Sequence, residues 1–229
     1  MKSFTILTLA KIFLKIKTTW GYQISRAKSF SCKGEMSLLF NVVKVTHIIT
    51  GILMAWPFYA LVIVNQRVKL GPPLGDRTDK YMENIIKSRT IPCFVFQATA
   101  LITGLALIFL RGLSVDILLT NPVLGAKLIL LVFIGGVTSY VHFSLQPRID
   151  SLFAKGGTPI PEKTASLIGA LRLRRKRLAS TCLFVVLTIA MLGVQVWAAF
   201  PLWLTLLLIA TIALFAWRAY RSVTPYGWM

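Results

Sequence analysis

The stretch NVVKVTHIITGILMAWPFYALVIV, residues 41–64, decides the class of fold. Apart from Lys44 and His47 near its beginning it carries no charged or imidazole side chain, and the next charged residue is Arg67. An α-helix rises 1.5 Å per residue, so about 20 apolar residues cross the hydrocarbon core of a bilayer. The stretch therefore predicts a transmembrane helix with a lysine and a histidine at its head.

The rest of the chain repeats this pattern. Hydrophobic residues make up 56% of the 229 residues and charged residues only 14%, against about 25% charged residues in soluble domains. The predicted fold is all-α, a polytopic transmembrane helical bundle of four core helices plus a fifth C-terminal helix, spanning residues 36–229. Trp56 and Pro57 lie in the middle of the first span and predict a kink there. We expect the spans at 45–65, 91–110, 123–145, 179–199 and 201–217, the last two forming a tight hairpin around Phe200 and Pro201.

The formal net charge of +19 is concentrated between the spans rather than along one polar face. This placement argues against nucleic-acid binding and predicts cytoplasmic loops rich in lysine and arginine. The basic loops are 66–90 and 147–178, and the second contains the run RLRRKR at 172–177, which we interpret as an anchor to anionic lipid. We therefore expect a multi-pass protein of the bacterial inner membrane with a cytoplasmic C-terminus. Its expected partners are the bilayer and a homo-oligomer or larger membrane complex.

The basic N-terminal extension, residues 1–35, does not fit this orientation. It carries seven basic residues and one acid, Glu35, yet five crossings place it outside. Three explanations stay open. The natural start is Met36, or the segment is an interfacial amphipathic helix with Lys11 and Lys15 on one face, or it is a transit peptide.

The depth of the few polar residues in the spans follows from the helical rise. His47 and Lys127 fall at one level near the outer face, with Gln195 at a similar level and Thr103 somewhat deeper. Ionisable groups inside a membrane usually face the bundle interior, so we expect a polar cluster of these four residues. The alternative is that Lys127 snorkels to the outer interface. His142 lies something like 20 Å deeper, so His47 and His142 cannot both bind one iron, whose axial ligands are about 4 Å apart.

Three stretches resemble helices of the HemJ-type protoporphyrinogen oxidases, and the same plan is shared with CopD-like copper-resistance membrane proteins. KVTHIITGILMAWPFYALVIVNQR, residues 44–67, resembles the first helix, which is opened by lysine-x-x-histidine. IIKSRTIPCFVFQATALITGLALIF, residues 85–109, resembles the second helix. NPVLGAKLILLVFIGGVTSYVHFSLQPRIDSLF, residues 121–153, resembles the third, with an early lysine and a late histidine.

The resemblance implies a membrane oxidoreductase that holds haem b and removes hydrogen from protoporphyrinogen. By position, it implies that His47 is the haem and metal ligand and that Lys127 is the catalytic lysine. His142 is a second candidate for cofactor binding, and an ordinary interfacial histidine is the alternative. Two other functions stay open: a non-catalytic membrane subunit or scaffold, and CopD-like copper handling. Copper needs soft ligands, and Met54, Cys93 and Cys182 are dispersed in the sequence.

Overall fold

A computed structural model describes residues 34–64, 75, 77–156, 160–198 and 200–221. Nearly all of the basic N-terminal extension lies outside these ranges, so its three explanations stay open. Every regular element in the described ranges is a helix, as predicted. The elements are α2 (Gly34–Leu53), α3 (Ala55–Val64), α4 (Arg77–Leu110), α5 (Ile117–Thr120), α6 (Pro122–Tyr140), the π-helix η2 (Val141–Leu145), α7 (Gln146–Lys155), α8 (Glu162–Gln195) and α9 (Leu202–Arg221).

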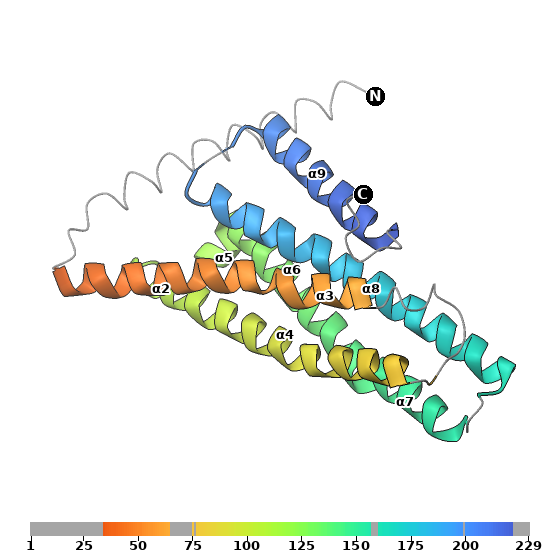
Figure 1. The fold of residues 1–229 in the computed structure, drawn as a ribbon. Coiled ribbons are helices and arrows are strands. Elements are labelled where there is room, and N and C mark those ends of the chain that lie inside the picture. Colours follow the sequence, from red (N-terminus) through yellow and green to blue (C-terminus); the bar gives the residue numbers. More distant parts are fainter. Residues whose placement is uncertain (1–33, 65–74, 76, 157–159, 199, 222–229) are drawn as a thin grey trace.

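The helices form an elongated bundle in which α8 is central (Figure 1). It packs against α2, α3, α6, α7 and α9, while α4 packs against α2, α3 and α6. Helix α9 turns back along α8 and also touches α3, which confirms the predicted hairpin. Within the described ranges, five stretches are long and apolar enough to cross a membrane, which confirms a multi-pass helical bundle: Leu38–Val62, Asp79–Leu110, Pro122–Lys155, Glu162–Gln195 and Leu202–Arg221.

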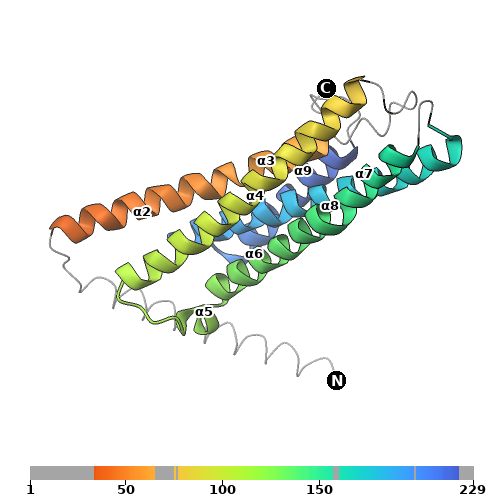
Figure 2. The same ribbon diagram turned by 90° about the horizontal axis from the view of Figure 1, so that it is seen from below.

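The bundle has two ends that differ in chemistry. At one end of the bundle α2 and α6 begin and α4 and α8 finish. The short α5 lies there, between the end of α4 and the beginning of α6 (Figure 2). We call this the His47 end. At the opposite end α4 and α8 begin and α7 lies beside them. We call it the ion-pair end, because buried carboxylates and guanidinium groups meet there.

The first span is interrupted at Met54, where α2 ends and α3 follows. Pro57 has no N–H to donate to the carbonyl of Leu53 one turn earlier, so the helical ladder is broken at this point. The Met54 N–H still donates to the Thr50 carbonyl at 2.9 Å, which keeps the two segments continuous. The interruption at Pro57 is the predicted kink, and Met54 is buried in the core beside it.

Two of the spans that are longer than predicted begin in charged sequence. Helix α4 begins at Arg77 rather than near residue 91, and α8 begins at Glu162 rather than near residue 179. The additional turns contain acids in α4 and arginines in α8 that pair with one another. A search for apolar stretches excludes charged residues. The prediction therefore began each of these two spans only after the charged turns, because it could not show that their charges are paired and buried.

Candidate functional site

His47 lies against α4 at the His47 end of the bundle. Its Nδ1 atom is 2.8 Å from Oγ1 of Thr103. The next residue, Gly104, lets the imidazole approach the helix backbone, because a Cβ atom at that position would lie 3.2 Å from Cε1 of His47. Two consecutive residues of α4 thus define where the ring sits, one through a hydrogen bond and one through its missing side chain.

The hydrogen bonds of Thr103 determine which imidazole nitrogen carries the proton. The Thr103 hydroxyl lies 2.6 Å from the Thr99 carbonyl oxygen, and two oxygens at that distance need a proton between them. The hydroxyl has only one proton. Thr103 Oγ1 must therefore accept from His47 Nδ1–H. In the neutral ring the lone pair then lies on Nε2, the arrangement that a metal ligand or general base requires.

Lys127 reaches the same region from α6. Its ammonium group interacts electrostatically with His47. It also lies over Gly193 of α8, where a Cβ atom would be 3.4 Å from Nζ. No hydrogen bond or ion pair between residues in the described ranges involves Lys127. The structure thus brings together His47, Thr103 and Lys127, and leaves the lysine without an acceptor among these residues.

Gln195 does not join this cluster. Its side-chain amide donates to Oγ1 of Thr205 in α9 at 3.1 Å. Gln195 follows Gly193 by two residues, which rotates it by about 200° around the helix axis. The depth estimate placed Gln195 at the level of Lys127, but the side chain faces α9 rather than the interior site.

His142 lies in the π-helix η2, away from His47. Its ring contacts the rings of Phe94 and Phe143 edge-on, with centroids 5.9 and 4.8 Å apart. Phe94 and Thr103 are nine residues apart on α4, about 14 Å along the helix. His47 and His142 therefore belong to different levels of the bundle and cannot bind one metal ion together.

A second polar cluster, which sequence reasoning missed, lies at the ion-pair end. Arg172 donates to both carboxylate oxygens of Asp79, at 2.8 and 2.9 Å. Arg175 donates to both oxygens of Glu83, each at 2.8 Å. All four side chains are buried. The Arg172 Nε atom is also 2.8 Å from Glu83 Oε1, without the alignment of a hydrogen bond.

The π-helix completes this cluster. Gln146 follows η2 directly, accepts from Arg175 and donates to Glu83 at 3.3 Å and to Asp150 at 3.1 Å. Pro147 lacks an N–H and crowds the preceding turn, which accounts for the widened helical turn before it. The widened turn places the Gln146 amide between α4 and α8, where it bonds both Glu83 and Arg175.

Three residues of the run RLRRKR are buried rather than turned toward lipid headgroups: Arg172, Arg175 and Lys176. The interpretation of the run as a lipid anchor is therefore wrong for these three. The available signal was spacing. On α4, Asp79, Glu83, Ile86, Thr90, Cys93 and Gln97 follow one another at intervals of four and three residues, which keeps them on one helix face. All six are buried, so that face continues past the predicted beginning of the span.

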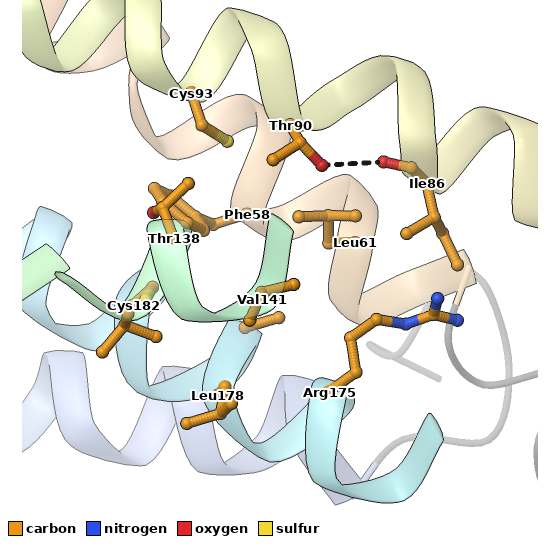
Figure 3. Close-up of a pocket in the computed structure, with 12 residues that line it drawn as sticks. Phe58, Leu61, Ile86, Thr90, Cys93, Thr138, Val141, Arg175, Leu178 and Cys182 are labelled. Atoms are coloured by element: carbon orange, nitrogen blue, oxygen red, sulfur yellow. Dashed lines mark hydrogen bonds between the residues drawn. The ribbon is translucent and has the colours of Figure 1, made fainter. Parts of the chain in front are cut away.

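A cavity of about 20 Å³ lies between the two clusters, next to Arg175. Cys93 of α4 and Cys182 of α8 both line it (Figure 3). Two of the three candidate copper ligands, dispersed in the sequence, thus lie beside the same cavity. Within the described ranges, however, no three His, Cys, Asp or Glu residues are arranged to hold a metal ion, and the lining is almost entirely apolar. We therefore develop no copper site from this cavity.

Comparison with known proteins adds nothing to these observations. No family model matches the chain, and no curated protein and no solved structure matches it.

Proposed function

We propose that the chain binds haem b at the His47 end and acts as a haem-associated membrane oxidoreductase of the HemJ type. The observation that carries the proposal is the hydrogen-bonding of His47. Thr103 binds the Nδ1–H group, so the Nε2 lone pair is directed away from that bond. Histidine ligands of metals characteristically donate their second N–H to a neighbouring acceptor in this way.

The residues around His47 fit an amphipathic, iron-containing ligand. Gly104 and Gly193 leave the imidazole and the Lys127 ammonium close to the backbones of α4 and α8. Haem needs an axial imidazole and carries carboxylates that pair with cations. Lys127, half-buried and without an acceptor among the described residues, supplies such a cation near His47.

Each residue then has a separate task. His47 would hold the iron through Nε2, and Thr103 keeps the ring in the tautomer that makes this nitrogen available. Lys127 would bind a carboxylate of the group and so orient it. When bound, haem supplies one-electron redox chemistry. His142 takes no part at this iron, because it contacts α4 about 14 Å further along the helix.

The proposal is tested by the absorption spectrum of the full chain purified in detergent. The expected result is a Soret band with close to one haem per chain, and loss of that band in His47→Ala. A Lys127→Gln variant should keep the axial ligation and bind haem more weakly. Protein that contains no haem, and takes up none when haem is added, contradicts the proposal. A non-catalytic role then becomes the better explanation of the polar residues.

A further inference from the structure

Two cationic side chains lie on the indole ring of Trp197 at the His47 end. Lys44 Nζ is 3.9 Å from the ring centroid, and the Arg111 guanidinium carbon is 4.1 Å from it. The two cations thus share the aromatic surface of one indole. Phe40 contacts Trp197 edge-on and lies 5.5 Å from Arg111. We call these four residues the rim cluster.

The rim cluster concentrates positive charge without a counterion in the part of the chain that the structure describes. The charges of Lys44 and Arg111 are no more than about 8 Å apart, since each lies about 4 Å from the same ring. Neither takes part in an ion pair with any residue that the structure describes. Asp116, in the loop after Arg111, accepts a hydrogen bond from Ser114 instead. The two like charges repel each other, and an anion beside them removes that cost.

The position of the rim cluster fits the headgroup of an amphiphile. Lys44 precedes His47 by one turn of α2, and Trp197 follows Gly193, the residue beneath Lys127, by one turn. Cationic groups therefore extend from inside the bundle to its rim. Aromatic and cationic side chains together are typical of the membrane interface, where apolar chains meet headgroups.

We propose that Lys44 and Arg111 form an anion-binding site for the carboxylate or phosphate group of an amphiphile at the His47 end. Trp197 holds both cations in place by cation–π contact. Two sources present this chemistry: the headgroup of an anionic phospholipid, and a second carboxylate of a ligand already bound at Lys127. The second source rests on the proposed function, whereas the first does not.

The test uses the double variant Lys44→Gln/Arg111→Gln of the full chain, which keeps Trp197. Its matched control is Arg148→Gln/Lys155→Gln, which removes one exposed arginine and one exposed lysine near the opposite end. Retention of phosphatidylglycerol against phosphatidylcholine is measured by native mass spectrometry. Affinity for haem is compared with affinity for its dimethyl ester, whose carboxylates carry no charge.

We expect the double variant to lose about thirtyfold in affinity for one of the two anionic probes, since each interfacial cation contributes about a factor of five to six. The control should change neither. Loss confined to phosphatidylglycerol assigns the site to lipid, and loss for haem but not for its ester assigns it to the ligand. Unchanged affinity for both probes overturns the proposal.

Two further measurements keep the outcome decisive. If the double variant does not fold, Lys44→Gln alone and the salt dependence of the wild-type chain replace it, because an interfacial ion contact weakens as salt increases. If the wild-type chain binds no haem, the proposed function fails and the phosphatidylglycerol measurement still decides whether the rim cluster binds anions.

Discussion

His47 of α2 and Thr103 of α4 are joined by a 2.8 Å hydrogen bond between Nδ1 and Oγ1, across two separate spans. The threonine hydroxyl donates a hydrogen bond to the Thr99 carbonyl oxygen, 2.6 Å away. The bond therefore has a direction, from histidine to threonine, and this direction places the lone pair on Nε2. The proposed chemistry of the bundle depends on that one assignment.

Replacing Thr103 separates the hydrogen bond from the shape of the side chain. Thr103→Val keeps the volume of the side chain and removes the acceptor of the His47 Nδ1–H group. We therefore expect haem affinity to fall about tenfold, as it does when a residue that hydrogen-bonds a metal-bound histidine is replaced. Thr103→Ser keeps the hydroxyl and should bind haem nearly as the wild type does. The measurement is a haem titration followed at the Soret band. Equal affinity in Thr103→Val and wild type contradicts an orienting role for Thr103.

The glycine beneath the imidazole offers a steric test. A Cβ atom at Gly104 would lie 3.2 Å from His47 Cε1, so Gly104→Ala should displace the ring and weaken haem binding. Gly136→Ala is the control, because a Cβ atom there meets nothing within 4 Å. The control should be neutral or stabilising by up to about 1 kcal/mol, since alanine favours a helix over glycine. Haem affinity and thermal stability of both variants are compared, and identical behaviour removes the steric argument.

The ion-pair end predicts a large effect on stability. Glu83 is buried and accepts from Arg175 and Gln146, so Glu83→Ala removes the carboxylate that faces the buried Arg175 guanidinium. We expect a loss of about 3–5 kcal/mol in the free energy of unfolding, measured by denaturation in mixed micelles. Glu162→Ala, at an exposed position, should change stability by less than about 0.5 kcal/mol. A small effect at Glu83 indicates that its neighbours are satisfied in another way.

The buried thiols predict a pattern of chemical modification. Cys93 and Cys182 are 0% and 1% exposed. In a Cys32→Ser background, neither should react with N-ethylmaleimide in the folded protein, and both should react after denaturation. Mass spectrometry of the alkylated peptides gives the answer. Fast labelling of native Cys93 means that the cavity between α4 and α8 opens to solvent.

The sequence predicts the presence of the five spans because hydropathy reflects the energy of crossing a bilayer. It also predicts the kink, because Pro57 lacks an N–H wherever it lies in a helix. The longer extents of α4 and α8 could not be predicted this way. The additional turns are stabilised by pairing between Asp79 and Arg172, which are 93 residues apart in the chain, so the sequence does not reveal that they meet.

The candidate site was predictable in depth but not in rotation. Counting residues places His47, Lys127, Thr103 and Gln195 near one level; His47 and Thr103 are in contact, and Lys127 lies in the same region. Gln195 faces Thr205 because its position around the axis of α8 depends on how α8 and α9 pack. Depth follows from position in one helix, whereas the direction of a side chain depends on the neighbouring helices.

The role of His47 is tested most directly by removing the imidazole and supplying it from solution. His47→Gly should lack the Soret band of ligated haem and regain it when imidazole is added, while His142→Gly should keep the band without imidazole. Ligation that survives in His47→Gly, or that is lost only in His142→Gly, contradicts the assignment of His47 as the axial ligand.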